Sequence, residues 1–429
     1  MFLSTKDQSR RAPLKEAVLD SLPPDKGLYL PVELPPFPEA FWDGFREAPF
    51  SEIGYRCAKH WLGDEVPEEV LRELVADTLA FDAPLVEVAP GMQVLELFHG
   101  PTLAFKDFGA RFMARLMCWL TRDEDKMLTV LVATSGDTGG AVASAFHQVK
   151  GVEVIILYPS GKVSPLQEKQ LTTLGDNITA LEIDGSFDDC QALVKEAFHD
   201  PALADLYRLT SANSINISRL VPQAFYYLRA IQQLPEGSEP IFVVPSGNFG
   251  NLTAGMLAAE AGMPAKRFIA ATNANKVVPD YLESGSYQPK PSVPTISNAM
   301  DVGAPSNLPR LEAVLGNQFE TLKSRVSGAA FTDDETRDCM RRVHRHHGYL
   351  LCPHTAVAWL AAEQCQDPAT KVILATAHPS KFLETVLETL ELSKIDIPQR
   401  LASLADQEKV STKLGKDYQS FQEYLKQRR

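Results

Sequence analysis

Leu128-Thr-Val-Leu-Val-Ala-Thr-Ser-Gly-Asp-Thr-Gly-Gly140 is the stretch that decides the fold. It begins as a short apolar run rich in strand-forming residues, continues as a glycine-rich loop, and leads into a helical stretch at 141–150. A strand that is apolar throughout is buried on both faces, which is typical of parallel sheets covered by helices. This stretch therefore predicts one strand–loop–helix unit of an α/β protein.

The same unit recurs along the chain. Strand-like runs that each precede a helical stretch occur at 152–158 (helix 165–174), 177–183 (helix 187–198), 241–244 (helix 252–261) and 371–375 (helix 382–390). This alternation predicts parallel or mixed sheets flanked by helices. With 429 residues the chain is too long for one ordinary domain, so we expect two or three.

Charge and composition exclude several classes of partner. The 42 Lys and Arg residues are outnumbered by 55 Asp and Glu residues, which gives a net charge of −13. This balance argues against nucleic acid and anionic membranes as partners, because both are bound by clustered positive charge. The apolar runs are too short to cross a bilayer, and the first residues lack a signal-peptide core. The six cysteines form no CxxC pair, so we expect reduced thiols and a cytoplasmic protein.

Two glycine-rich loops, at 133–140 and 244–251, lie between a predicted strand and a predicted helix. Free backbone N–H groups and the helix dipole attract anions at such a position, and glycine lets the anion approach the backbone. Neither loop fits the dinucleotide or nucleoside-triphosphate pattern. One such loop is a weak signal, but two suggest a cofactor and a substrate that each carry an anionic group.

Lys106 opens a predicted helix over 107–120 and stands between Phe105 and Phe108. Apolar neighbours and a positive helix end would disfavour its ammonium form, and a neutral amine is what Schiff-base chemistry needs. A surface lysine at a helix start explains the same residues. The residues alone leave both interpretations open.

At these positions the chain resembles the threonine synthases, a family of pyridoxal-phosphate enzymes with the tryptophan-synthase-β-like fold (fold type II). The motifs that carry the resemblance are Leu3-Ser-Thr-Lys6, Asp25-Lys-Gly-Leu-Tyr-Leu-Pro31, Phe98-His-Gly-Pro-Thr-Leu-Ala-Phe-Lys-Asp-Phe108, Ala133-Thr-Ser-Gly-Asp-Thr-Gly139, Asn213-Ser-Ile-Asn-Ile-Ser-Arg219, Ser246-Gly-Asn-Phe-Gly-Asn251 and Thr376-Ala-His-Pro379. They are spread over most of the chain in one order, which makes the resemblance highly specific.

The resemblance implies a set of roles. Lys106 would form the Schiff base with pyridoxal 5′-phosphate, and Thr376 would face the pyridine nitrogen. The cofactor phosphate would lie on the loop Gly247, Asn248, Phe249, Gly250 and Asn251. The substrate would be O-phospho-L-homoserine, converted with water to L-threonine and phosphate, and its two anionic groups would be held by Ser135, Thr138, Ser214, Asn216, Arg219 and Asn248. The expected protein is a monomer or homodimer.

The resemblance also implies an active site in a cleft between domains. We expect an N-terminal domain over residues 1–90, a smaller α/β domain over 91–225 that carries Lys106 and the first glycine-rich loop, and a larger cofactor-binding α/β domain over 226–429. Two side chains have no settled role. Asp137 stands where many relatives of this fold have Asn near the phenolic oxygen of the cofactor, and a carboxylate there would repel a phenolate. His99 is either a site residue or a packed turn residue.

Other segments invite rival interpretations. We expect no metal site: His344, His346 and His347 fit a helix C-terminus that ends at Gly348, and we interpret Cys352-Pro-His354 as structural. The proline-rich stretch 284–309 is interpreted as a surface excursion rather than a flap over the site. The alternative functions are another fold-type-II lyase, such as a dehydratase or phospho-lyase, and a catalytically silent relative that still binds the cofactor.

Overall fold

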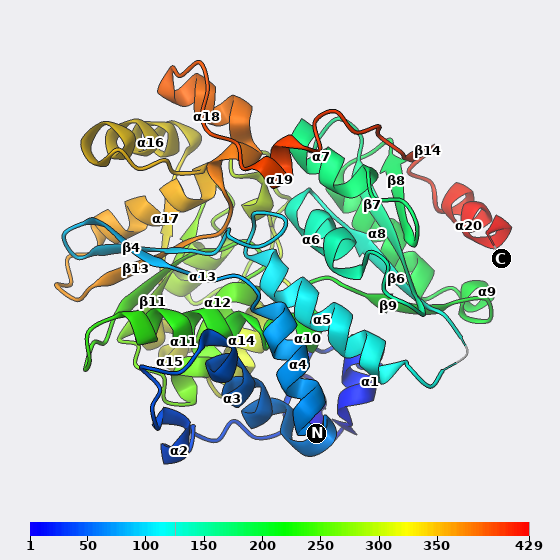
Figure 1. Ribbon diagram of the computed structural model, residues 1–429, viewed down its shortest axis with the longest axis horizontal. Helices are drawn as coiled ribbons and strands as arrows, with labels where there is room; N and C mark the ends of the chain where they lie inside the picture. The colour runs from blue at the N-terminus through cyan, green and yellow to red at the C-terminus, as the bar shows by residue number, and fades with distance from the viewer. Residues whose placement is uncertain (125, 429) are drawn as a thin grey trace.

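The computed structural model describes residues 1–124 and 126–428 as three sheets with helices packed on their faces (Figure 1). The largest sheet has six strands in the order β12-β11-β10-β13-β5-β4, and the second has five in the order β14-β8-β7-β6-β9. Both are parallel except that β4 pairs antiparallel with β5. The predicted α/β class with parallel and mixed sheets is confirmed.

The six-stranded sheet and its helices form what we call the large lobe. Its strands are β4 (Leu85–Ala89), β5 (Met92–Glu96), β10 (Ile241–Pro245), β11 (Arg267–Thr272), β12 (Val326–Ala330) and β13 (Lys371–Ala375). Alternate residues of β10 belong to two different cores. Phe242 and Val244 pack in one core with α11 (Gln223–Gln233) and α12 (Gly250–Glu260), whereas Ile241 and Val243 pack in another with α17 (Pro353–Gln364). Helices therefore cover both faces of this sheet, as its apolar strands predict.

The five-stranded sheet and its helices form the small lobe. Its strands are β6 (Leu128–Ala133), β7 (Val152–Pro159), β8 (Ile178–Ile183), β9 (Arg208–Ser211) and β14 (Thr412–Leu414). Its helices are α5 (Lys106–Leu120), α6 (Asp137–Phe146), α7 (Pro165–Thr172), α8 (Phe187–Phe198) and α20 (Tyr418–Gln427). Every residue of β6 and β7 is buried. The strands and helices predicted from the repeated unit are confirmed, with ends that differ by a few residues.

The N-terminal region packs against both lobes. It contains the three-stranded antiparallel sheet β2-β1-β3 (Arg11–Ala12, Phe2–Ser4, Tyr29–Pro31) and the amphipathic helices α3 (Phe50–Leu62) and α4 (Glu68–Thr78). Helix α3 contacts α11 of the large lobe, and α4 contacts α5 of the small lobe. Of the helices in the described ranges, none is both long enough and apolar enough to span a membrane.

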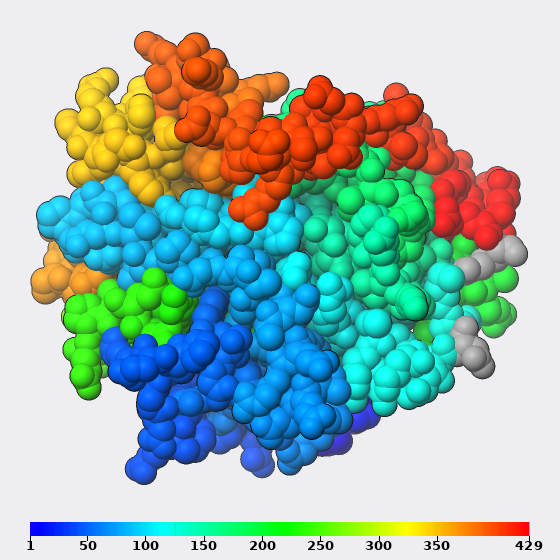
Figure 2. All heavy atoms as spheres, viewed as in Figure 1, coloured from blue at the N-terminus to red at the C-terminus, as the bar shows by residue number. Residues whose placement is uncertain are grey.

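The two main sheets are interleaved along the chain. Strands β4 and β5 precede the small lobe in sequence but pair within the large lobe, and β14 returns to the small lobe after the large lobe is complete. The returning segment leaves α18 (Leu383–Leu390) and runs along one edge of the molecule to the C-terminal helix (Figures 1 and 2). Sheet membership thus crosses the expected boundaries at 90/91 and 225/226, and those boundaries stay a prediction.

Backbone hydrogen bonds fix the start of α5 beside the end of β13. The segment before Lys106 runs antiparallel to the segment after Ala375: Phe105 N donates to Thr376 O (2.9 Å), and His378 N donates to Leu103 O (3.0 Å). An isolated bridge between Ala104 and Ala377 lies between these bonds. The lysine and the threonine that the sequence singles out, which are 270 residues apart, are therefore held together by main chain rather than by side chains.

Candidate active site

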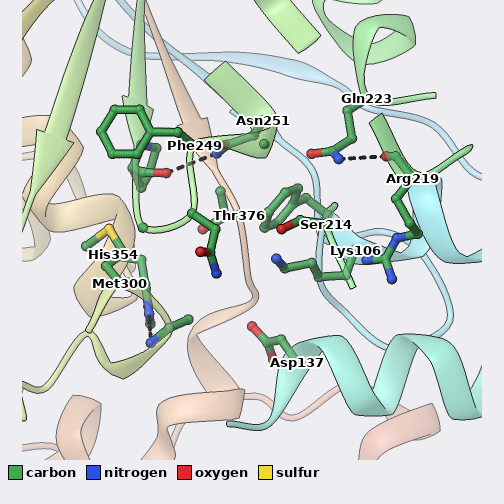
Figure 3. A pocket seen from close by; sticks show the side chains of 16 residues that line it. Lys106, Asp137, Ser214, Arg219, Gln223, Phe249, Asn251, Met300, His354 and Thr376 are labelled. Atoms are coloured by element: carbon green, nitrogen blue, oxygen red, sulfur yellow. Dashed lines mark hydrogen bonds between the residues drawn. The ribbon is translucent and has the colours of Figure 1, made fainter. Parts of the chain in front are cut away.

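A pocket opens where the carboxyl ends of β10 and β13 meet the first turns of α5, α6 and α12 (Figure 3). Ligands of parallel α/β proteins bind at this edge of the sheet because strand ends and helix N-termini converge there. The residues that line it are Phe105, Lys106, Asp137, Ser214, Arg219, Gln223, Pro245, Gly247, Asn248, Phe249, Gly250, Asn251, Ala299, Met300, His354 and Thr376. Most of the side chains that the sequence singled out are brought together here.

Lys106 has the electrostatics that an imine-forming amine requires. Burial, together with the positive charge of Arg219, lowers the pKa of Lys106 to about 8, although Asp137 acts in the opposite direction. Its Nζ lies 4.7 Å from the centroid of the Phe105 ring. Phe108 packs its ring against Phe81 and Tyr226 instead. The expected loss of ammonium character is present, and a neighbouring cation that the sequence analysis did not consider contributes to it.

The loop between β10 and α12 is shaped to receive an anionic group. A Cβ placed on Gly247 would lie 2.8 Å from Ala299 O and 3.0 Å from the Cα of Met300, so only glycine fits there. Phe249 adopts a left-handed conformation (φ 62°), which is rare for a residue of its size. Asn251 clamps the loop by donating from Nδ2 to Pro245 O (3.0 Å; Figure 3). The loop thus presents the N-terminus of α12 to the pocket, which suits a phosphate.

Arg219 reaches the pocket from the short helix α10 (Ile217–Leu220). One guanidinium nitrogen donates to Ala212 O (2.6 Å), while the buried Nε has no hydrogen-bond partner among the described residues. A Cβ on Gly109 would lie 2.9 Å from that Nε, so glycine at this position of α5 makes room for the arginine. Burial lowers the pKa of Arg219 to about 10, which still leaves it charged at neutral pH. It is a buried cation suited to an anionic ligand.

Asn216 lies behind Arg219 and not in the pocket. Its side chain caps α10 by accepting from Ser218 N (3.0 Å) and donates to Val18 O and to Ser21 Oγ (both 2.8 Å). The amide of Asn216 makes its hydrogen bonds within the protein and does not line the pocket, so its expected contact with substrate stays a prediction. It holds the helix that carries Arg219.

Three other expected site residues also lie outside the pocket lining. Ser135 and Thr138 belong to the loop and first turn of α6, of which Asp137 alone lines the pocket. His99 places its Nε2 2.7 Å from Glu96, whose carboxylate also accepts from Tyr349 (2.7 Å). The role of His99 therefore stays a prediction.

His354 lines the pocket, so the structural role predicted for Cys352-Pro-His354 does not describe it fully. Its Nε2 accepts from Ala299 N (3.2 Å), so the proton of the neutral ring lies on Nδ1, which is buried and has no partner among the described residues. Burial lowers the pKa of His354 to about 4, with Lys106 and Lys381 acting in the same direction against Asp137. The ring is therefore a neutral donor at the pocket wall.

Asp137 also has a partner that the sequence analysis missed. Its Oδ1 lies 2.6 Å from the Nζ of Lys381 and accepts from Gln167 Nε2 (2.8 Å). Burial opposes ionisation of Asp137, but the Lys381 ammonium outweighs it and the pKa of Asp137 is lowered. The carboxylate that faces the pocket is thus charge-compensated from behind.

The stretch 284–309 is not only a surface excursion, because Ala299 and Met300 form the pocket wall against Gly247. The histidines of α16 (Asp333–His347) do lie at a helix C-terminus, where Gly348 adopts φ 64° and donates to His344 O. Within residues 1–124 and 126–428, no cluster of three or more His, Cys, Asp or Glu side chains could hold a metal ion.

Models of known families match nearly the whole chain. Residues 93–377 match the model described as pyridoxal-phosphate dependent enzyme, residues 1–79 the threonine synthase N terminus, and residues 355–425 the threonine synthase C-terminal model. The chain belongs to the threonine synthase family. Its members are pyridoxal-phosphate-dependent enzymes of fold type II, so pyridoxal 5′-phosphate is the cofactor whose fit the pocket must meet. The pocket fits this cofactor in three respects. It has a glycine loop at a helix N-terminus, a buried hydrogen-bond donor without a partner on His354, and a lysine with a lowered pKa.

Individual threonine synthases are similar over their full length. The threonine synthase of Serratia marcescens is 45% identical over 423 residues, which cover 98% of this chain and 97% of the relative. The crystal structure of threonine synthase from Escherichia coli superimposes with a TM-score of 0.93 at 44% identity and full coverage of both chains. A pyridoxal-phosphate-bound threonine synthase from Brucella melitensis gives a TM-score of 0.92 at 35% identity, covering 99% of this chain and 98% of the other. The threonine synthase family therefore accounts for every part of the fold.

Proposed function

We propose that this threonine synthase family enzyme is a carbon–oxygen lyase that converts O-phospho-L-homoserine and water to L-threonine and phosphate. The observation that carries the proposal is the pairing of Lys106 and Arg219 in one pocket. One is an amine with a lowered pKa, and the other is a buried guanidinium with an unpartnered Nε. The amine suits the amino-acid chemistry, and the guanidinium suits an anionic substituent.

The cofactor would be held by residues from the large lobe and the start of α5. Lys106 would bond to its aldehyde carbon, the backbone of Gly247–Asn251 would hold its phosphate, and Thr376 would face its pyridine nitrogen. When bound, pyridoxal phosphate supplies an electron-accepting ring next to the substrate α-carbon. A hydroxyl rather than a carboxylate at the ring nitrogen makes the ring a weaker electron acceptor, which limits side reactions.

Lys106 would also move protons. With cofactor and substrate bound, the Nζ of Lys106 would be a free base inside the pocket. A pKa of about 8 leaves a useful fraction of this amine neutral at physiological pH. We propose that it passes protons one at a time. It removes the α-proton and, after releasing that proton, a β-proton, and it returns a proton to the γ-carbon after phosphate has left. It returns a second proton to the α-carbon once water has supplied the β-hydroxyl group and given its remaining proton to the phosphate.

Substrate anions would be recognised on the Arg219 side of the pocket. Ser214, whose Oγ accepts from Asn307 (3.2 Å), and Asn248, whose Oδ1 accepts from Ser306 (3.0 Å), line the pocket with Arg219. With Asp137 paired to Lys381, the remaining charges of the pocket lining are positive. A local positive site in a chain of net charge −13 favours a substrate with a phosphate and a carboxylate.

The test separates this reaction from those of other fold-type-II lyases. The purified enzyme is incubated with O-phospho-L-homoserine, and phosphate, threonine and 2-keto acid are measured together, with L-threonine alone as a second substrate. We expect phosphate and threonine in equal amounts and little keto acid from either substrate. Keto acid from L-threonine would identify a dehydratase, phosphate with keto acid in place of threonine would identify a phospho-lyase, and cofactor binding without turnover would identify a silent relative.

The Schiff-base residue has its own test. Borohydride reduction of the native enzyme, followed by peptide mapping, should place the reduced cofactor on Lys106, and Lys106→Ala should lose both the label and turnover. A label on another lysine would contradict the assignment.

The six free cysteines fit a reducing compartment, and we propose the cytoplasm as the location.

A further inference from the structure

A second buried lysine lies directly behind the pocket. Lys381 belongs to the short 3-10 helix η3 (Pro379–Phe382), which follows β13 and Thr376. Its side chain is fully buried, and its Nζ lies 2.6 Å from Asp137 Oδ1 and 2.8 Å from the carbonyl oxygen of Thr102. A buried ammonium is unfavourable without such partners, and a buried carboxylate is unfavourable without a cation, so the two groups stabilise each other.

Lys381 joins the segments that build the pocket. Asp137 opens α6 in the small lobe, whereas Lys381 follows the large-lobe strand β13. Thr102 belongs to the loop before Lys106, and it donates from N and Oγ1 to the carboxylate of Asp107 (2.9 and 2.7 Å), the residue next to Lys106. One ammonium group therefore connects both lobes and the loop that positions Lys106.

The backbone of Lys381 is fixed as well. Its carbonyl oxygen accepts from Ser164 Oγ (3.0 Å), just before α7 of the small lobe. Gln167, from the first turn of α7, donates to the same Asp137 oxygen that Lys381 contacts. The pair is thus held from two sides, and its geometry is not that of a mobile surface ion pair.

Charge explains why the pocket needs this pair. An uncompensated Asp137 on the pocket wall would repel a cofactor and a substrate that both carry anionic groups. The titratable groups around Asp137 are Lys381, Lys106, His354 and Cys352. Burial lowers the pKa of His354 to about 4 and raises the pKa of Cys352, so both are neutral at pH 7. Lys106 would be bonded to the cofactor in the proposed site, so Lys381 is the cation that compensates Asp137.

We propose that Lys381 is a positioning residue that holds Asp137 as a charge-compensated carboxylate on the pocket wall and thereby keeps the pocket receptive to anionic groups. The inference rests on the proposed cofactor site. It explains how an acidic residue is tolerated beside it.

The experiment is a double-variant cycle read by cofactor binding. Lys381→Met, Asp137→Asn and the double variant are prepared without cofactor, and pyridoxal phosphate affinity is measured by fluorescence between pH 6 and pH 9. Loss of Lys381 leaves Asp137 buried and unpaired, so we expect affinity at pH 8 to fall on the order of 100-fold. The loss should be smaller at pH 6, because burial without the ammonium raises the pKa of Asp137 and the carboxylate takes up a proton.

The double variant separates charge from structure. If compensation is the role of Lys381, removal of both charges restores affinity to within about tenfold of the unmodified protein and removes the added pH dependence. If Lys381 is only a structural anchor for Thr102, the double variant binds as weakly as Lys381→Met, and the proposal is overturned. Should Lys381→Met fail to fold, a folded double variant supports compensation and an unfolded one overturns it.

A control comes from another lysine that pairs with carboxylates, of which Glu182 is buried and Glu168 partly exposed. Lys409 contacts Glu168 and Glu182 (both 2.7 Å), and neither glutamate lines the pocket. Lys409→Met should leave cofactor affinity and its pH dependence unchanged. The cycle is independent of the substrate, so it stands even if the enzyme acts on another amino acid; absence of cofactor binding by the unmodified protein would instead refute the proposed function.

Discussion

Replacement of Lys106 by Met should stabilise the cofactor-free protein at neutral pH. Burial, with the charge of Arg219, lowers the pKa of Lys106 from 10.5 to about 8. A tenfold loss of proton affinity corresponds to about 1.4 kcal/mol, so the buried ammonium costs the folded state up to about 3 kcal/mol. Methionine keeps the length of the aliphatic stem without the charge. Lys106→Met therefore removes the cost together with the chemistry.

The effect has a defined dependence on pH. Below pH 8 the amine is protonated in both states, and the whole cost is present. Between pH 8 and pH 10.5 the unfolded chain binds the proton and the folded protein does not, so stability rises with pH. Above pH 10.5 the amine is neutral in both the folded and the unfolded protein, so the free-energy cost of burying its charge has disappeared. The advantage of the Met variant is largest at pH 7 and vanishes toward pH 10.5.

The expected shift in melting temperature follows from the size of the chain. At about 2.1 cal/mol/K per residue, 429 residues have an unfolding entropy of about 0.9 kcal/mol/K. A gain of about 3 kcal/mol then raises Tm by about 3 °C at pH 7 and by less than about 1 °C at pH 10.5. Calorimetry of the two cofactor-free proteins at both pH values measures it.

The control variant, Lys409→Met, should change Tm in the opposite direction. Burial alone would lower the pKa of Lys409, but the carboxylates of Glu168 and Glu182 raise it, so its charge stabilises the folded state. Lys409→Met should therefore lower Tm at pH 7. An unchanged or lower Tm for Lys106→Met at pH 7, or a gain of equal size at both pH values, would refute the claim that the surroundings of Lys106 destabilise its ammonium form.

Three further substitutions test the pocket. Gly247→Ala places a Cβ within 2.8 Å of Ala299 O, and we expect pyridoxal phosphate affinity to fall at least about tenfold in a fluorescence titration; unaltered affinity would show that the loop is not the cradle. His354→Phe removes the Nδ1–H donor, and kcat/KM should fall about 10- to 100-fold, consistent with one buried hydrogen bond, whereas a full-rate enzyme would make the ring a packing residue. Arg219→Met should raise KM for O-phospho-L-homoserine. It should also shift the acidic limb of cofactor binding, on which Lys106 loses its proton, to higher pH, because the pKa of Lys106 rises without the arginine; an unmoved limb would contradict this coupling.

The fold could be predicted from sequence where burial is continuous. Strands β6 and β7 are buried at every position, so their apolar runs identify them directly. Strand β9 (RLTS) and strand β12 (VSGAA) are partly exposed and carry polar or small residues. A search for continuous apolar runs therefore does not identify them. The pairing of β5 with β13 also lay beyond the sequence, because it joins residues nearly 280 positions apart.

The site could be predicted where one segment holds the chemistry. Lys106 and the loop 247–251 belong to motifs of consecutive residues, and such motifs can be recognised in a sequence without knowledge of the tertiary structure. Lys381 and His354 act only because tertiary packing brings them to Asp137 and Ala299. Nothing in Pro379-Ser-Lys-Phe382 distinguishes its lysine from others in the chain. Asn216 is the converse case: it stands in a family motif, but its side chain makes its hydrogen bonds within the protein and lies outside the pocket lining.

Four unfavourable features meet in this one pocket. Lys106 loses part of its affinity for a proton, Arg219 and His354 each bury a nitrogen without a partner among the described residues, and Phe249 adopts a backbone conformation that costs about 1–2 kcal/mol. A core under selection for stability alone would not keep such features together. An anionic ligand with hydrogen-bond acceptors would relieve the first three, because each offers a positive charge or an N–H group. The pocket is therefore organised for its ligands at the expense of the empty protein, and the Asp137–Lys381 pair shows the same rule, since the one negative charge on its wall is neutralised from behind.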